Sequence, residues 1–475
     1  MSTLSKVKIL GGSVTDIFNF VFIAVLLSLP AIILKDWILF SFPLIIAIIL
    51  SRVYGERFII ALVLISLFTL IGDISRTLRT IVQLTDLSLI GYLFLKRYGL
   101  NFSTYKSVPK SVIYFLILYF SAMLLASIFS EFPFAGVNTI INQLIFFILV
   151  YLFYSLIDDE ADVKNYFTSI IIVACILVSV SLISFYLEGY TLTDIIVKDR
   201  TRVSGIMSNF EASSNFFVIA VPILISIVLT KKNRSKLSSL SWMIILFIIV
   251  GLILSMSRSA IIGIVISSLI VFFMLKRKQF YRFLIFLAFI ILLFMIYPPL
   301  NEFVTLLFRI EEGYSARDSL WAMSIAMIKD HPVFGIGPGV YNHELFNYFP
   351  FMLDNFYGRV FIYFSEVANG VNLAHNIFLV LFVDLGILGL LTSIFLPIIY
   401  FTIGIKTIKK YKEKSQYVLI IGIFAAGTSV IFRNILNSIG LIYVGGVYTD
   451  LPFWLIFSSI VYFYKKAPKS YLLKD

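Results

Sequence analysis

The sequence has too few charged residues for a soluble protein of its length. Only 13% of its 475 residues are Asp, Glu, Lys or Arg, whereas 60% are hydrophobic. A soluble domain normally carries roughly 25% charged residues. A soluble chain could not bury this much apolar surface, so lipid must be the solvent for most of it. The composition therefore excludes a soluble enzyme and predicts an integral membrane protein.

Cysteine and histidine are also scarce. Cys175 is the single cysteine and lies in an apolar run, which excludes an intrachain disulfide. The three histidines are scattered and have no acidic cluster beside them, so they make a poor metal site. For two of them, His331 and His343, a structural or surface role is favoured. We expect no metal and no other cofactor.

Long apolar runs make up most of the chain. A helix needs about 17–25 apolar residues to cross the hydrocarbon, where only helices or closed barrels satisfy the backbone. The runs are continuous rather than alternating, which favours helices. We predict an all-α polytopic membrane protein, one domain over residues 1–475, with about 12–14 spans among 17–34, 37–50, 58–71, 81–95, 111–128, 138–157, 165–187, 213–230, 241–257, 259–275, 281–297, 374–404, 416–432 and 451–464. The span 374–404 is long enough to tilt or to break near Gly386, Gly389 or Pro397.

The distribution of basic residues predicts the topology. If the N-terminus is cytoplasmic and the spans alternate, most Lys and Arg fall on the inner side, as the positive-inside rule requires. Both termini are then cytoplasmic, and the longest loop, residues 298–373, lies outside. We assign the net charge of +12 to contact with anionic lipid head groups at the inner face, not to nucleic-acid binding.

The outer loop 298–373 contains short structured elements. Ser315 and Asp318 have the spacing of a capping box and precede an apolar stretch, which predicts a helix. This helix should end near Asp330, because the residue before Pro332 disfavours helical geometry. The stretch Gly335-Ile-Gly337-Pro338-Gly339 is interpreted as a structural turn. No strand precedes it and no lysine follows it as in a phosphate-binding loop.

Four polar residues fall at the outer boundary of the membrane in this topology. Arg202 either interacts with lipid head groups or belongs to a functional site. Arg317 either forms an ion pair on the loop surface or belongs to such a site, and His375 either forms a hydrogen-bonded helix start or belongs to it. Arg258 lies in a hairpin with almost no loop, where a lone arginine is costly unless paired, so a functional role is favoured. Because all four residues fall on the same side of the membrane, we predict a functional site there.

The stretches around these residues resemble motifs of the O-antigen ligase and O-antigen polymerase family. The resemblance covers roughly residues 200–400, with the family's long periplasmic loop between the last two motifs. Each motif alone is unspecific, whereas their order is specific. The family often has Pro-Asn where this chain reads Ser208-Asn209-Phe210, so Arg202 is the weakest transfer. The motifs are Ser257-Arg258-Ser259-Ala260, then Arg317-Asp-Ser-Leu-Trp321 through His331-Pro332-Val-Phe-Gly335-Ile-Gly337-Pro338-Gly339, and Ala374-His375-Asn376 followed by Leu379 and Gly386-Ile-Leu-Gly389.

The resemblance implies a membrane glycosyltransferase. Such enzymes transfer a glycan from a polyprenyl-diphosphate carrier to a hydroxyl of a lipid or glycan acceptor, at the outer face of the cytoplasmic membrane. Arg258 and Arg317, with Arg202 as a weaker third, would bind the diphosphate, because arginine presents a planar fork of donors. His375 would take the proton of the acceptor hydroxyl. A single displacement would invert the anomeric centre without a metal.

Two other functional classes fit a polytopic chain of this size. A flippase or transporter for lipid-linked oligosaccharides should place charges near mid-membrane in related halves. Only Asp86 and Asp384 clearly fall within predicted spans, and no internal repeat is visible. A non-catalytic scaffold would not need the shared side and order of Arg258, Arg317 and His375. Within the enzyme class, ligase and polymerase both stay open.

Overall fold

The computed structural model describes residues 55–69, 76–99, 105–190, 210–230, 236–296, 316–351, 374–442 and 446–466. Within these ranges all regular secondary structure is helical. The elements are α3 (Glu56–Thr69), α4 (Arg76–Tyr98), α5 (Lys110–Phe129), α6 (Pro133–Ser155), α7 (Glu160–Leu187), α9 (Phe210–Thr230), α10 (Lys236–Ser255), α11 (Arg258–Leu275), α12 (Arg277–Ile296), α14 (Ala316–Asp330), α15 (Tyr341–Glu344), the 3-10 helix η4 (Leu345–Phe351), α17 (Ile377–Tyr411), α18 (Tyr417–Arg433) and α19 (Val447–Lys465).

Seven of the described helices are long and apolar enough to cross a membrane, namely α5, α6, α7, α9, α10, α11 and α17. The prediction of an all-α polytopic membrane protein is therefore confirmed. The twelve predicted spans from 58–71 onward each coincide with a helix, but five of these helices are either too short or not apolar enough to be counted as membrane-spanning. Helices α3 and α18 are short, while α4, α12 and α19 include polar turns. The predicted spans 17–34 and 37–50 lie outside the described residues.

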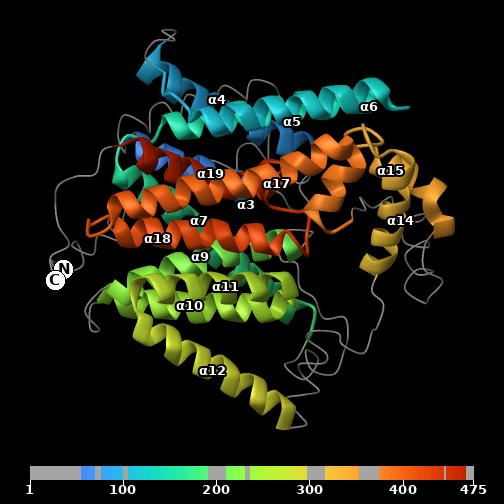
Figure 1. Cartoon of the computed structure of the whole chain (residues 1–475). Helices are drawn as coiled ribbons and strands as arrows, with labels where there is room; N and C mark the ends of the chain where they lie inside the picture. Colours follow the sequence, from blue (N-terminus) through green and yellow to red (C-terminus); the bar gives the residue numbers. More distant parts are fainter. Residues whose placement is uncertain are drawn as a thin grey trace.

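Helix α9 lies at the centre of the bundle, packed against α7, α10, α11 and α18 (Figure 1). Nearly all of its side chains are buried, including Phe216 and Phe217. A helix that is apolar all round is stable only inside a core, which explains its position. Its first turn is consequently surrounded by the ends of neighbouring helices.

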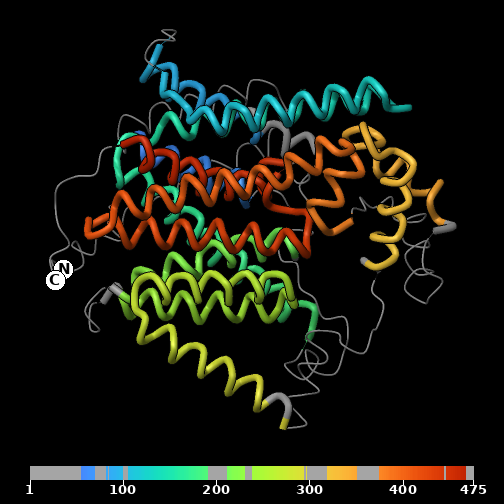
Figure 2. Tube along the Cα trace, viewed as in Figure 1, coloured from blue at the N-terminus to red at the C-terminus, as the bar shows by residue number. Residues whose placement is uncertain are grey.

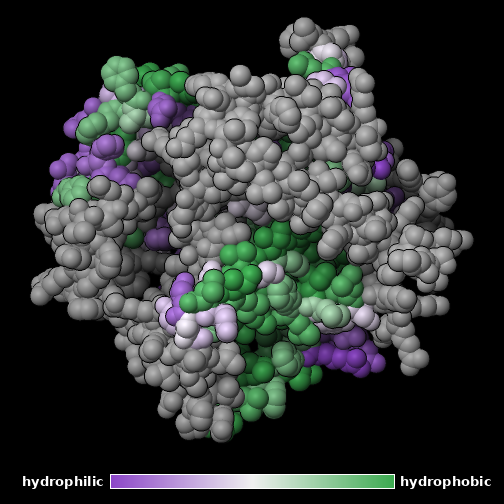
Figure 3. Space-filling view, turned by 180° about the vertical axis from the view of Figure 1, so that it is seen from behind, coloured by the Kyte–Doolittle hydropathy of each residue, from purple (hydrophilic) through white to green (hydrophobic). Residues whose placement is uncertain are grey.

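Large apolar side chains cover the periphery of the bundle. Ile285 on α12 is 68% exposed and Phe134 on α6 is 88% exposed. Figure 3 shows apolar side chains gathered over a broad area of the rear face. A surface of this kind is rare on soluble proteins, and contact with lipid tails explains it here.

The chain runs back and forth between two ends of the bundle (Figure 2). We call one the loop end, because α14, α15 and η4 lie there beside the start of α17 and the loop between α5 and α6 (Figure 1). We call the other the basic end, where α17 and α19 finish and Lys410 donates hydrogen bonds to the carbonyls of Tyr464 and Lys466. Exposed lysines follow one another there along the end of α17.

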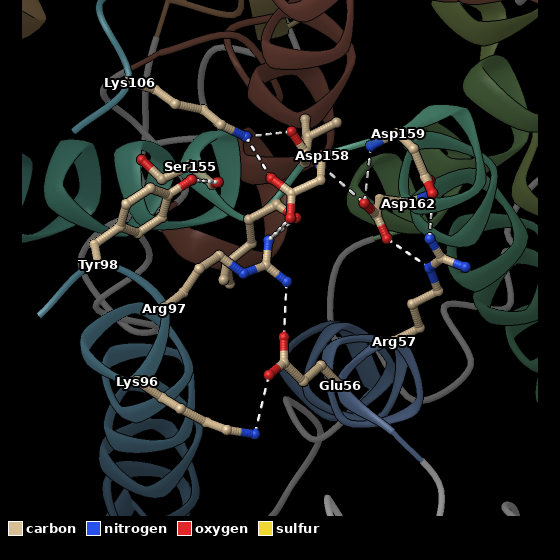
Figure 4. Close-up of polar contacts among 12 residues, drawn as sticks. Glu56, Arg57, Lys96, Arg97, Tyr98, Lys106, Ser155, Asp158, Asp159 and Asp162 are labelled. Atoms are coloured by element: carbon tan, nitrogen blue, oxygen red, sulfur yellow. Dashed lines mark hydrogen bonds and ion pairs between the residues drawn. The ribbon is translucent and has the colours of Figure 1, made fainter. Parts of the chain in front are cut away.

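Ion pairs join the helices at the basic end (Figure 4). Arg97 at the end of α4 pairs with Glu56 of α3 (2.7 Å) and with Asp158 before α7 (2.6 Å). Arg57 reaches Asp162 in the first turn of α7 (2.7 Å). These carboxylates are therefore engaged in holding α3, α4 and α7 together.

The long helix α17 is broken at Gly386, which is one of the predicted break points. Its φ is +63°, and a Cβ there would lie 2.1 Å from the carbonyl oxygen of Val333. Residues 331–339 dock against this break, where the amide of Ile336 donates to the carbonyl of Val383 (2.9 Å). The glycine-rich stretch is thus a structural turn that packs against the kinked helix. Pro397 lies within α17 without interrupting it.

The prediction of short helices within the long loop 298–373 is also confirmed. Helix α14 ends at Asp330, directly before the His331-Pro332 pair, as the proline predicts. Tyr348 of η4 donates a hydrogen bond to the Asp330 carboxylate (2.9 Å), which holds η4 against the end of α14. Residues 298–315 and 352–373 of this loop lie outside the described ranges.

Candidate functional site

Four helix ends meet at the loop end: the starts of α9, α11 and α17, and the last residue of α18. The first turn of α9 contributes Glu211, Ser214 and Asn215, all of them buried. Polar side chains inside a membrane protein are costly unless they are paired or serve a function. Their partners therefore define the site.

Arg433, the last residue of α18, is fully buried and binds the first turn of α9. One of its terminal nitrogens donates to the backbone carbonyl of Glu211 and to the hydroxyl of Ser214 (3.1 Å). The other donates to the side-chain oxygen of Asn215 (3.2 Å), whose amide donates to the carbonyl of Thr449 (2.9 Å). A buried arginine with several acceptors fixes its neighbours rigidly.

His375 lies directly before α17, next to this cluster. Its backbone has a φ of +47°, an uncommon conformation for a residue other than glycine. Asn376 then caps α17, since its side chain accepts hydrogen bonds from the amides of Phe378 and Leu379. The imidazole Nδ1 lies 3.9 Å from a carboxylate oxygen of Glu211.

Arg258 is the first residue of α11 and is half-buried. The preceding Ser257 accepts a hydrogen bond from Ser214 of α9 (3.3 Å), so Arg258 follows directly on a contact with the site. Met256 before it has a φ of +46°, which makes the reversal between α10 and α11 very tight. The prediction that Arg258 lies in a hairpin with almost no loop is thus confirmed.

Arg317 lies in the first turn of α14, and its side chain is outside the described part of the structure. Trp321, one turn later, donates a hydrogen bond from its indole Nε1 to the carbonyl of Ala374 (2.6 Å). Residues four apart lie on the same helix face, so the start of α14 is close to His375. Arg202 lies outside the described residues.

The other two histidines lie away from this cluster. His331 and His343 are both exposed, and His343 stacks on Phe132 at 5.1 Å between ring centroids. These positions agree with the structural or surface role predicted for them.

Glu211 and Arg433 were not predicted from the sequence as site residues. Both lie at the ends of apolar runs, which is the signal that singled out Arg258. The span predicted as 416–432 stops one residue before Arg433. The hydrogen bond from Arg433 to the carbonyl of Glu211 joins residues 222 positions apart, and no local sequence pattern indicates it.

The site has the chemistry to bind an anion and to move a proton. Helices α11 and α17 begin at the site, and α14 contacts it through Trp321; helix N-termini favour negative charge. Arg258 adds a full positive charge at one of them. His375, 32% exposed at its side chain, is accessible to a substrate, and an imidazole is a group that can accept a proton.

Comparison with known proteins identifies this region. A protein-family model described as O-antigen ligase matches residues 243–394, which contain Arg258, Arg317 and His375. Glu211 and Arg433 lie outside the matched residues. No curated protein matches the chain. The resemblance predicted from the motifs is confirmed for this region. The chain is a multi-pass membrane protein in which residues 243–394 match an O-antigen ligase family model, and this match supports a role in membrane glycan transfer.

Proposed function

We propose that the protein transfers a glycan from a polyprenyl-diphosphate carrier to an acceptor hydroxyl, as a ligase or a polymerase. The observation that carries this proposal is the convergence at the loop end. Arg258, the first turn of α14 with Arg317, and His375 come from three helix starts that are far apart in sequence. Ser257, directly before Arg258, is hydrogen-bonded to Ser214 of α9, and Trp321 of α14 is hydrogen-bonded to Ala374, directly before His375.

Arg258 and Arg317 bind the diphosphate, with Arg202 as a third partner. Charge develops on the diphosphate as the glycosidic bond to phosphate breaks. Arginine donors preorganised around it stabilise that charge without a metal, and the helix starts that carry Arg258 and Arg317 add to the field.

His375 acts as the general base. The acceptor oxygen attacks the anomeric carbon, the bond from that carbon to the diphosphate oxygen breaks, and the hydroxyl proton passes to the imidazole. The bonding electrons leave with the diphosphate. A single displacement of this kind inverts the anomeric configuration.

The loop end faces outward from the cytoplasmic membrane, with both termini on the cytoplasmic side. The run of exposed lysines at the opposite end supports this orientation, because basic residues are retained on the cytoplasmic side. Lipid-linked glycan would then reach the site from the outer leaflet.

The two carboxylates within spans give little support to a transporter. Asp384 accepts a hydrogen bond from the amide of Gly339 (3.2 Å), and Asp86 accepts one from Ser66 (2.8 Å). Asp384 lies next to the break in α17, and Asp86 joins α4 to α3. Both have structural tasks that explain their burial.

The decisive experiment supplies purified protein in lipid nanodiscs with a polyprenyl-diphosphate oligosaccharide and candidate acceptors. Mass spectrometry should detect a new glycosidic bond and free polyprenyl diphosphate. Transfer to a lipid acceptor would identify a ligase, and elongation of the glycan would identify a polymerase. Lipid that crosses a vesicle membrane with its covalent structure unchanged would refute the enzyme and favour a flippase.

A further inference from the structure

Glu211 and His375 face each other across the boundary between α9 and α17. The Glu211 carboxylate lies 3.9 Å from Nδ1 of His375, which is longer than a hydrogen bond and close enough for an ion pair when the imidazole is protonated. The Glu211 side chain is 9% exposed, against 32% for His375. The imidazole is therefore the more accessible of the two groups, although its Nδ1 atom is buried.

Two consecutive residues at the end of α18, Arg433 and Asn434, hold the backbones of Glu211 and His375 in place. Arg433 binds the backbone carbonyl of Glu211. Its neighbour Asn434 accepts a hydrogen bond at its carbonyl from the amide of Ile377 (3.2 Å), two residues after His375. The last residue of α18 and the residue that follows it thus fix the two backbones that carry the carboxylate and the imidazole.

We propose that Glu211 is a positioning residue for His375 in glycan transfer, which rests on the function proposed above. Glu211 accepts the Nδ1 hydrogen, so that Nε2 carries the lone pair that takes the acceptor proton. The pair closes to hydrogen-bond distance in the substrate complex, as catalytic contacts often do. Once Nε2 is protonated, the carboxylate stabilises the imidazolium.

The proton balance of this arrangement is simple. The acceptor O–H bond breaks, Nε2 of His375 gains the proton, and Glu211 stays ionised throughout. The imidazolium then releases its proton to water before the next cycle. Glu211 makes no contact with the acceptor, so its effect passes entirely through His375.

A purely structural role for Glu211 predicts different behaviour. A carboxylate in the first turn of a helix stabilises that helix through its dipole. Removing it would then lower thermal stability while leaving the pH dependence of transfer unchanged. The pH profile therefore separates the two roles.

The experiment compares Glu211→Gln with wild type and with Glu344→Gln, a control that removes another buried carboxylate at the loop end. Initial rates of transfer are measured from pH 5 to 9 in nanodiscs. The loss of the carboxylate lowers the histidine pKa, because a nearby opposite charge favours the protonated form. We expect the acidic limb to move to lower pH and the plateau rate to fall about 10- to 100-fold. This loss is smaller than the roughly 10²- to 10⁴-fold contribution of the general base itself, because the imidazole is still present. Glu344→Gln should change neither the position of the acidic limb nor the plateau rate.

Other charged groups on the elements around this pair stay in place in both variants, so the shift reports Glu211. They are Arg258, Asp318, Arg433 and Asp450.

A double variant supplies the second test. Glu211→Gln added to His375→Ala should have almost no further effect, because two residues that act as one unit are not additive. If the substitution cuts the residual rate by the same factor as in wild type, Glu211 acts independently and the proposal fails. An unshifted acidic limb in Glu211→Gln would also overturn it. Wild-type protein that forms no glycosidic bond would refute the proposed function instead, so the two failures are distinguishable.

Discussion

The indole of Trp321 donates a hydrogen bond of 2.6 Å to the backbone carbonyl of Ala374, the residue before His375. This contact ties α14 to the residues that lead into the membrane-spanning helix α17. It therefore places the first turn of α14, which carries Arg317 in its backbone, next to the segment that carries His375.

Trp321→Phe keeps an aromatic ring but loses the donor. A net hydrogen bond is worth about 1 kcal/mol, which corresponds to roughly a 5-fold change in rate. We expect a loss of about that size in kcat/KM for the lipid-linked donor, measured by initial-rate kinetics. Trp242→Phe, on the half-exposed lipid-facing side of α10, is the matched control and should transfer normally. Equal activity of the two variants would show that the Trp321 bond is dispensable.

Arg258→Lys retains the charge and removes the planar fork. Removal of a preorganised donor from a developing anion costs about 10²- to 10³-fold in rate, and lysine should recover only part of it. Transfer should therefore fall about 10²-fold, with normal expression and insertion. Arg282→Lys, an exposed arginine on α12, controls for arginine loss in general. A fully active Arg258→Lys enzyme would reduce Arg258 to a structural anchor.

His375→Ala should reduce transfer by about 10²- to 10⁴-fold, the usual contribution of general-base catalysis. Binding of the lipid-linked donor should be retained, because the arginines bind the diphosphate. The acidic limb of the pH profile should disappear, since histidine loses its base function as it becomes protonated at low pH. His331→Ala and His343→Ala, both at exposed positions, should leave rate and profile intact. Normal transfer by His375→Ala would mean that another group is the base.

Cysteine labelling tests which end of the bundle faces outward. Lys329→Cys at the loop end and Ser415→Cys at the basic end both replace exposed residues in a Cys175→Ala background. A membrane-impermeant thiol reagent should label intact cells only at position 329. Labelling only at position 415 would invert the topology and place the site in the cytoplasm.

Most of the described long helices could be predicted from sequence, because they form in largely apolar runs. The break in α17 could also be predicted, since Gly386 lies in a run too long for a single span. The end of α14 followed from Pro332. In each case the signal lies within a few residues of the feature, and local chemistry decides the outcome.

The site could be predicted only in part. Arg258 was recognisable as a charge in a loop-less hairpin, and His375 through a motif. Glu211 and Arg433 were not recognised, since their roles depend on α18 packing against α9. That contact follows from the shapes of two helices that are apolar on most sides, and hydropathy does not encode which helix is the neighbour.

The position of Arg433 late in the chain has a consequence for biosynthesis. Helices α9, α11, α14 and α17 leave the ribosome before α18, so the hydrogen bonds from Arg433 to the first turn of α9 form only after α18 has inserted. Asn434 fixes the start of α17 at the same moment. The buried polar cluster around Glu211 can therefore be complete only once α18, a late helix, has inserted beside α9.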